Sequence, residues 1–381
     1  MTPLRPLVRR LHLIATAVFG LFAIAAGLSG SALVFRPELE RALYEPRVVA
    51  GTTPLPLETL RARAAEVDPM RRISMLILPD RTGRPAQFIL QKRDARTLKE
   101  ADQIAVYVNP YTGVVEGSRR REASVLGRLR DLHFAFFAGP AGLTFNGYVA
   151  MALMFLSASG FILWIQASPA RQRFRFSLRG NVRSVIWNLH RQTGLVSFAL
   201  LILVCVTGAY YSFRDSYLAA IQTVTGSLPP RGSPPVPPPS PAEPPKSIDE
   251  IAAAARAAFP EGRLAVLRIP ARESAAWTAT FHRPGDIGES TDSGPTLHLS
   301  PFTLETIRRD DIADMPLGAR VVKRMEPVHY GKFGGLPTRL MWLGLGLLPL
   351  GFALSGATMW WNRTRAAQTP SVKPPGRGSP A

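Results

Sequence analysis

Four long apolar stretches separate the more polar parts of the chain. They lie at about 11–35, 143–166, 190–213 and 339–361. About 20 helical residues cross the hydrocarbon core of a bilayer, so each stretch predicts one membrane-spanning helix. The first stretch follows basic residues, as the core of a signal peptide does, but its apolar run of about 25 residues exceeds the roughly 7–15 residues of such a core. We therefore expect the first span to be retained.

The polar segment after the first span has a different hydrophobic pattern. Residues 55–67 have the pattern of a short amphipathic helix, and 72–79, 86–92 and 104–108 alternate as strands do. The last of these strands runs into an Asn-Pro-Tyr-Thr-Gly turn signal. This segment therefore predicts a small α+β domain.

The polar segment after the third span repeats this order. Ser247 is the expected N-cap of a helix over 247–259, with Glu250 three residues later in a capping box. Strands are expected at 263–269, 275–282 and 296–299. The two segments together predict two α+β domains of the same kind.

The spans themselves carry a repeat that includes four of the six histidines. Gly30 lies 18 residues after His12, and Gly208 lies 18 residues after His190. The second two histidines of the repeat, His133 and His329, each precede a Ser-Gly dipeptide by 26 residues. This ungapped spacing predicts an internally duplicated four-span helical bundle with two outer α+β domains.

The expected organisation has eight segments. They are an N-terminal tail and first span at 1–36, a first outer domain at 37–131, a histidine segment and second span at 132–166, a basic loop at 167–187, a third span at 188–214, a second outer domain at 215–327 with a proline-rich linker at 227–246, a histidine segment and fourth span at 328–361, and a disordered tail at 362–381. The proline-rich linker is expected to be extended and solvated.

The charge of the chain fits this topology. The net charge is +19, and residues 1–12, 167–187 and the tail after Trp361 are rich in Arg or Lys and carry no acid. Under the positive-inside rule these parts are cytoplasmic, which places both termini in the cytoplasm and both long polar segments outside. Membrane topology thus accounts for the charge, and we expect no nucleic-acid partner.

The lone cysteine, Cys205, lies within the third span. One cysteine excludes a disulfide within the chain and any metal site that needs several thiolates. We expect this thiol to act as a small apolar residue.

Repeated histidines near apolar spans suggest a metal or haem site. Parallel repeats place His12 with His190 at one depth and His133 with His329 at another. Each pair could supply two axial imidazoles to one haem, while the second ring nitrogen binds a fixing partner. The alternative is that these are interfacial histidines that bind lipid headgroups.

Several other residues have two interpretations. The glycines of the spans could admit a flat cofactor or simply allow close helix packing. Arg36 and Arg214, just outside their spans, could bind propionates or an anionic substrate, or could be interfacial side chains. His282 and His298 lie in expected strands outside the repeat, and we expect them at the surface.

The residues resemble a known family, the PepSY-associated transmembrane proteins of bacteria, over about 1–365. The resemblance rests on Arg10-Leu11-His12 leading to Gly30, on Leu189-His190-Arg191 leading to Thr207-Gly208, and on Val328-His329 with the glycine-rich turn after it. It implies a multi-pass protein of the bacterial inner membrane with outer PepSY-like modules. It also implies that His12, His133, His190 and His329 are the ligands of haem b iron, with two haems expected.

The first functional hypothesis is an electron-transfer protein of iron uptake. The family includes reductases of ferric siderophores, so the resemblance implies a quinol or protein electron donor and a periplasmic Fe(III) chelate as acceptor. We expect no side chain to act as catalytic acid, base or nucleophile. The rival hypothesis is a non-enzymatic, membrane-anchored PepSY protein that binds or regulates a periplasmic peptidase. A transporter is disfavoured because the spans lack charges near their centres.

Overall fold

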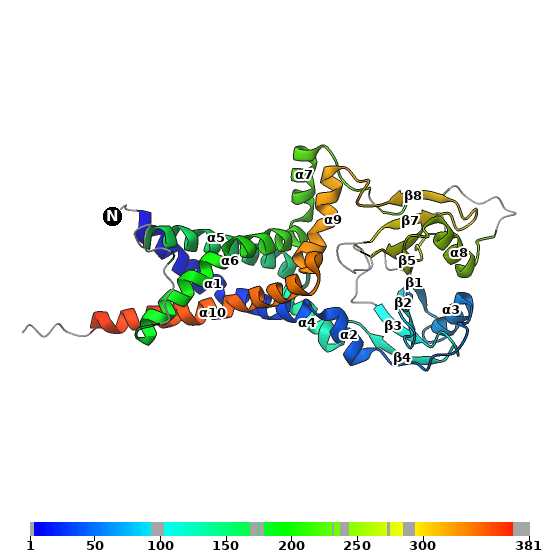
Figure 1. Cartoon of the computed structure of the whole chain (residues 1–381), viewed down its shortest axis with the longest axis horizontal. Coiled ribbons are helices and arrows are strands. Elements are labelled where there is room, and N and C mark those ends of the chain that lie inside the picture. Colours follow the sequence, from blue (N-terminus) through cyan, green and yellow to red (C-terminus); the bar gives the residue numbers. More distant parts are fainter. Residues whose placement is uncertain are drawn as a thin grey trace, which may run out of the picture. The chain divides into compact units, whose positions relative to one another are not determined.

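A computed structural model of the chain describes residues 4–92, 103–167, 174, 179–230, 232–236, 244–272, 275–284 and 294–368, the side chains of 365–368 excepted. Within these ranges the chain forms long helices, short helices and strands, which Figure 1 labels in chain order. The expected tail after residue 368 and much of the expected basic loop fall outside the described residues.

Four helices of the described residues are long and apolar enough to cross a membrane. They are α1 (Leu4–Leu33), α5 (Gly139–Ala167), α6 (Val182–Ser212) and α10 (Gly335–Gln368). A helix is thus confirmed at each of the four predicted spans; every helix begins before its apolar stretch, and α1 and α6 end one or two residues inside it. The chain divides into two compact units, of which the first comprises Met1–Leu28, Tyr148–Val206 and Gly344–Ala381.

Small residues allow two helices of the first unit to pack closely. A side-chain carbon added at Gly27 in α1 would lie 2.4 Å from the carbonyl oxygen of Gly346 in α10. Close backbone approach at small residues is typical of helix packing in lipid, where there is no hydrophobic drive between helices. Gly27 is thus required by helix packing.

The second unit, Ser29–Gly147 and Thr207–Leu343, contains the sheet. Its described strands are β1 (Arg71–Ile77), β2 (Ala86–Lys92), β3 (Gln103–Val108), β4 (Val115–Arg120), β5 (Arg263–Arg268), β6 (Trp277–His282), β7 (Thr296–Leu299) and β8 (Thr306–Asp310). They form one antiparallel sheet in the order β4-β3-β2-β1-β5-β6-β7-β8.

The two polar segments therefore share one sheet, instead of forming the two separate domains expected from the sequence. The pairing of β1 with β5 joins them, with Leu76 opposite Leu267. If each segment formed its own sheet, β1 and β5 would be edge strands with unpaired backbone groups. Their pairing with each other removes both of these edges. Each segment also gains a fourth strand, β4 or β8, that the sequence analysis did not predict.

Two helices cover one face of this sheet, α3 (Leu57–Ala65) and α8 (Ile248–Ala258) (Figure 1). Leu60, Phe88, Ile248 and Phe281 are fully buried in a common core that draws on both segments. Ser247 and Glu250 form the predicted capping box of α8. The hydrophobic pattern of both segments is thus satisfied by one core.

One carboxylate connects the two covering helices. Asp249 of α8 accepts hydrogen bonds from the backbone N–H groups of Leu57 (2.7 Å) and Glu58 (2.9 Å) at the start of α3. The first N–H groups of a helix have no partner within it, so an acceptor from another element can cap them. The residue that caps α3 therefore comes from the other polar segment.

Short helices lead from the long helices to the strands and back. They are α2 (Arg36–Tyr44), α4 (Val125–Ala135), α7 (Arg214–Thr225), α9 (Leu317–His329) and the 3-10 turn η3 (Lys332–Gly334). The sequence analysis did not assign them as helices. With them, both halves follow the same order: long helix, short helix, helix, four strands, short helix, long helix.

Part of the proline-rich linker packs against the sheet unit. Pro235 forms a bridge with Ala275, and Val236 is buried beside Ala276 and Phe302. The expectation of a wholly solvated linker is therefore wrong for these residues. Residues 231 and 237–243 lie outside the described ranges.

Candidate functional site

The four repeated histidines lie on four different helices. His12 is in α1 and His190 is in α6, both within the first unit, and we call them the first pair. His133 is in α4 and His329 ends α9, both within the second unit, and we call them the second pair. The first pair lies within two of the long helices. The second pair lies on short helices that precede the other two long helices, α5 and α10.

Each histidine of the first pair forms a hydrogen bond with a serine of another long helix. Nδ1 of His12 lies 2.8 Å from Oγ of Ser159 in α5, and Nδ1 of His190 lies 2.7 Å from Oγ of Ser355 in α10. Each serine therefore contacts the same ring nitrogen, Nδ1, of its histidine.

The direction of these hydrogen bonds follows from the serine hydroxyls. Ser159 donates its proton to the carbonyl oxygen of Leu156 (3.1 Å), and Ser355 donates to that of Gly351 (2.7 Å). A hydroxyl has one proton, so each serine oxygen accepts from Nδ1–H of its histidine. Assigned in this way, the tautomer leaves Nε2 as the nitrogen that could bind a metal.

The second pair repeats the arrangement with longer contacts. Nδ1 of His133 lies 3.3 Å from Oγ of Ser29 in α1, and Nδ1 of His329 lies 3.2 Å from Oγ1 of Thr207 in α6. All four histidines thus use Nδ1 toward a hydroxyl of a long helix.

A glycine follows each of these hydroxyl residues in sequence and lies against the histidine ring. A side-chain carbon added at Gly30 would lie 2.8 Å from Cε1 of His133, and one at Gly208 would lie 3.0 Å from Cε1 of His329. Real side-chain carbons almost never show the separation found at Gly30, and the separation at Gly208 is tighter than most real contacts. A larger residue at either position would require the histidine ring to shift.

The glycines beside the first pair are less crowded. An added carbon at Gly160 would lie 3.6 Å from Cε1 of His12, and one at Gly356 would lie 3.9 Å from Cε1 of His190. These are ordinary van der Waals separations. A Ser-Gly or Thr-Gly dipeptide therefore faces each of the four histidines, but with different clearance in the two units.

The rings of the second pair have a separation that suits a shared metal ion. The ring centroids of His133 and His329 are 6.2 Å apart, with an angle of 42° between the planes. Metal–imidazole bonds are about 2.0 Å long and the nitrogen lies about 1.1 Å from the ring centroid, so two imidazoles on one metal have centroids roughly 6 Å apart. The two imidazoles therefore lie at the centroid separation that two ligands of one metal ion have.

Aromatic rings surround the second pair. Phe134 lies 6.0 Å from the His133 ring, and Tyr211 lies 5.6 Å from the His329 ring, measured between centroids. An apolar shell of this kind limits water access and influences the potential of a bound metal. Within the described ranges, no three His, Cys, Asp or Glu side chains cluster as ligands of a metal ion.

The end of α4 positions His133. The side-chain amide of Asn146 donates a hydrogen bond of 2.7 Å to the backbone carbonyl oxygen of His133. Phe136 follows in the left-handed conformation, with φ of 47°, and turns the chain toward α5. The terminal carbonyl of α4 would otherwise lack a partner within the helix.

The two candidate anion-binding arginines differ in their surroundings. The Arg36 side chain donates to Glu40 (3.0 Å) within α2. Arg214 is exposed at the start of α7. The repeat thus places both residues at the start of a short helix, while only Arg36 has a described carboxylate neighbour on the next turn.

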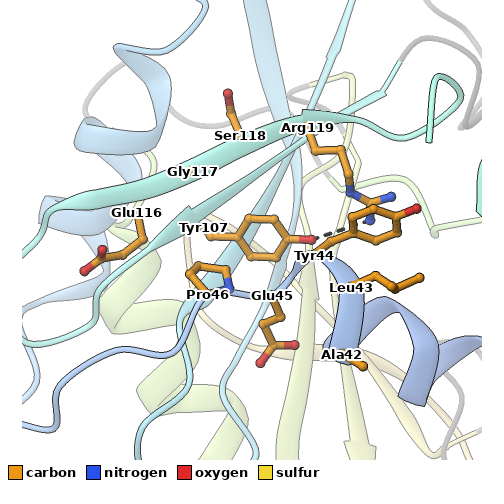
Figure 2. Close-up of a pocket in the computed structure, with 10 residues that line it drawn as sticks. All are labelled: Ala42, Leu43, Tyr44, Glu45, Pro46, Tyr107, Glu116, Gly117, Ser118 and Arg119. Carbon is orange, nitrogen blue, oxygen red and sulfur yellow. Dashed lines mark hydrogen bonds between the residues drawn. The ribbon is translucent and has the colours of Figure 1, made fainter. Parts of the chain in front are cut away.

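The second unit also has a hollow of about 460 Å³ beside the edge strand β4 (Figure 2). Residues 42–46, Tyr107 of β3 and residues 116–119 of β4 line it. The guanidinium of Arg119 lies 4.0 Å from the centre of the Tyr44 ring and donates to the hydroxyl of Tyr107 at 3.5 Å. Burial raises the pKa of Tyr107, so its phenol stays neutral and can donate.

The structure changes one sequence-based assignment and adds two residues that the sequence analysis missed. His298 is buried, not at the surface: Nδ1 lies 3.3 Å from Thr278 Oγ1 and Nε2 lies 2.9 Å from Asp310 Oδ2. The sequence analysis also missed Ser29 and Thr207 as hydrogen-bond partners of the second pair. The signal for them was present, because each precedes a glycine of the repeat.

Comparison with known proteins identifies the family of the chain. No curated protein sequence matches the chain. A family model described as the PepSY-associated TM region matches residues 9–363, which include all four repeated histidines and the whole sheet. The chain therefore belongs to the family of PepSY-associated transmembrane regions, as its sequence predicted.

Proposed function

We propose that this protein is a haem-containing electron-transfer protein of the bacterial inner membrane. Its acceptor is a periplasmic Fe(III) chelate, such as a ferric siderophore, and its role is in iron uptake. One observation carries the proposal: four histidines direct Nδ1 to a hydroxyl and pack Cε1 against the following glycine. Four repetitions are hard to explain by headgroup binding, which needs no fixed tautomer.

The histidines, the hydroxyl residues and the glycines each have a separate proposed role. His12 and His190 would hold one haem b and His133 and His329 another, each through Nε2. Haem supplies the one-electron change between Fe(III) and Fe(II). The hydroxyls fix ring orientation, and the glycines leave room for the rings. No side chain has to act as acid, base or nucleophile.

The direction of electron transfer follows from the proposed topology. With both termini in the cytoplasm, a quinol or a protein donor would deliver electrons toward the first pair, and the acceptor would receive them on the periplasmic side, near the second pair. Reduction of an Fe(III) chelate weakens it, since hard oxygen ligands hold Fe(II) less tightly. Exposed Arg214 is a candidate contact for an anionic chelate.

The test is a visible spectrum of the full chain, purified in detergent from cells supplied with a haem precursor. We expect a dithionite-reduced minus oxidised spectrum of b-type, bis-histidine haem, and a pyridine haemochrome count close to two per chain. His282→Ala, which changes a histidine of β6 outside the repeat, is the matched control and should leave the count unchanged. A colourless wild-type protein rules out the proposal.

The second candidate function is a non-enzymatic PepSY protein that binds a periplasmic peptide or peptidase. The hollow beside β4 supports it, because Tyr44, Tyr107 and Arg119 present aromatic surface and hydrogen-bond donors there (Figure 2). Gly117 has no atom within 4 Å of an added side-chain carbon, so a side chain can start there, and Gly117→Leu would place apolar bulk at the hollow. Peptidase capture that is lost in this variant, by a haem-free protein, would favour this function.

A further inference from the structure

The two histidine pairs differ in the strength of their hydrogen bonds. The Nδ1-to-hydroxyl distances are 2.8 and 2.7 Å for His12 and His190. They are 3.3 and 3.2 Å for His133 and His329. Hydrogen bonds of the first pair are at the short end of the normal range, whereas those of the second pair are at its long end or just beyond it.

The serines of the first pair donate to backbone carbonyl oxygens of their own helices. Ser159 donates to the carbonyl oxygen of Leu156, and Ser355 donates to that of Gly351. A hydroxyl that donates becomes a better acceptor, because hydrogen bonds in a chain strengthen one another. The chain from carbonyl to hydroxyl to Nδ1–H therefore draws the Nδ1 proton away from the ring.

Stronger donation from Nδ1–H makes the imidazole a more basic ligand at Nε2. A more basic ligand stabilises ferric iron over ferrous iron and lowers the reduction potential, since hydrogen bonding around the ligands is one of the determinants of that potential. The pair with the shorter hydrogen bonds should thus hold the iron of lower potential.

We propose that Ser159 and Ser355 are positioning residues that set the reduction potential of the iron at His12 and His190 below that of the iron at His133 and His329. This rests on the proposed function. An iron held by the first pair would then be the better electron donor: transfer of one electron from Fe(II) there to Fe(III) held by the second pair would be favourable, with no proton transferred. A quinol or protein donor supplies the electron.

The experiment is a spectroelectrochemical titration of the full, haem-loaded chain. We expect two midpoints in the wild type. The double variant Ser159→Ala, Ser355→Ala should raise the lower midpoint, with the ferric-to-ferrous ratio at a fixed potential falling about tenfold, or about 59 mV for one electron. Alanine is a good helix residue, so α5 and α10 should tolerate both changes.

Two matched variants distinguish the hydroxyl from its neighbourhood. Ser159→Thr with Ser355→Thr retains both hydroxyls and should restore the wild-type midpoint, just as threonine serves at position 207. Ser29→Ala with Thr207→Val removes the weaker hydrogen bonds and should shift only the upper midpoint, by less than tenfold. A chain that carries His12→Ala and His190→Ala identifies which midpoint belongs to the first pair.

The outcomes separate this inference from the proposed function. A wild type without haem overturns the proposed function and the inference with it. A wild type with two haems whose first-pair midpoint is the higher one overturns only the inference. So does a Ser159→Ala, Ser355→Ala variant that retains both haems and both midpoints. A raised lower midpoint that threonine restores supports it.

Discussion

The two histidine pairs of this protein share one sequence pattern but are supported in opposite ways. The first pair has short hydrogen bonds, at 2.7 and 2.8 Å, and loosely packed glycines, at 3.6 and 3.9 Å. The second pair has long hydrogen bonds, at 3.2 and 3.3 Å, and crowded glycines, at 2.8 and 3.0 Å. The first pair thus has the shorter hydrogen bonds, and the second pair has less free space beside its glycines.

The difference follows from where the histidines lie. His12 and His190 are interior residues of long helices, so the helix backbone determines the position and direction of each Cα–Cβ bond. His133 and His329 lie at or near the ends of short helices, where the backbone has fewer constraints. Close packing against glycine then determines the ring position. The same histidine motif thus occurs in two local structures that differ in hydrogen-bond length and in the space beside the glycine.

The largest effect should come from removing the histidines in different combinations. His12→Ala with His190→Ala removes both ligands of one haem and should leave one haem per chain. His12→Ala with His133→Ala removes one ligand from each pair and should reduce the count toward zero. Haemochrome counts of the two purified double variants measure this. Equal counts in the two variants would show that the pairing is different.

The next effect should come from the glycines, and it should differ between the units. Gly30→Ala and Gly208→Ala place a carbon against the rings of His133 and His329, and we expect each to destabilise the protein by about 1–3 kcal/mol, as overpacking does. Gly160→Ala and Gly356→Ala meet no such crowding and should be neutral or slightly stabilising in a helix.

Thermal unfolding in detergent, followed by circular dichroism, measures these four changes. The haemochrome count of each variant shows whether the affected haem is also lost. If Gly160→Ala were as damaging as Gly30→Ala, the contrast in clearance would have no energetic meaning.

A smaller effect should come from Asn146, which supports only the second pair. Its amide donates to the carbonyl oxygens of His133 (2.7 Å) and Phe134 (3.3 Å) at the end of α4. Asn146→Ala removes this donor, which we expect to cost about 0.5–1.5 kcal/mol. The upper midpoint should broaden or shift while the lower midpoint stays. A shift confined to the lower midpoint would contradict the assignment of the two pairs.

The smallest effect should be the pH dependence of one ion pair in the second unit. Arg339 binds both carboxylate oxygens of Glu38 at 2.7 and 2.6 Å, and this hydrogen bonding lowers the pKa of Glu38 below 4.5. The stabilisation is complete above pH 4.5 and is lost as the pH falls through the lowered pKa. The Glu38 side chain is 43% exposed, so we expect well under about 1 kcal/mol.

The comparison variant for this ion pair is Glu38→Gln, which keeps the shape and removes the charge. Melting temperatures of the two proteins should differ at pH 7 and converge as the pH falls through the lowered pKa of Glu38. The lower haem midpoint, which belongs to the first unit, should be the same in both proteins at pH 7. A difference that grows as the pH falls would have the wrong sign for this ion pair.

Much of the architecture could be predicted from the sequence because it depends on short-range patterns. Apolar length identified α1, α5, α6 and α10, and alternation identified strands at six of the eight described positions. The capping box of α8 was visible in two residues. The short helices α2 and α7 were missed, because each directly follows a span and lacks a side-chain N-cap bond.

The strand pairing could not be predicted in the same way. Nothing local to β1 or β5 specifies that they pair with each other, since either edge could have remained exposed. The choice is made by a core to which α3 and α8 both contribute, and by Asp249, which caps α3 from across the chain. The buried position of His298 has the same origin, because Asp310 reaches it only through the pairing of β7 with β8.

By itself, the sequence determined the spans, the family and the positions of the four histidines, because hydropathy and ungapped spacing are properties of the chain alone. Only the tertiary structure decided which hydroxyl each histidine contacts, how much room each glycine leaves, and that two polar segments form one sheet. Those are distances between residues far apart in the chain, such as the 147 positions that separate His12 from Ser159. Close packing sets such distances to within tenths of an ångström, and no local pattern contains them.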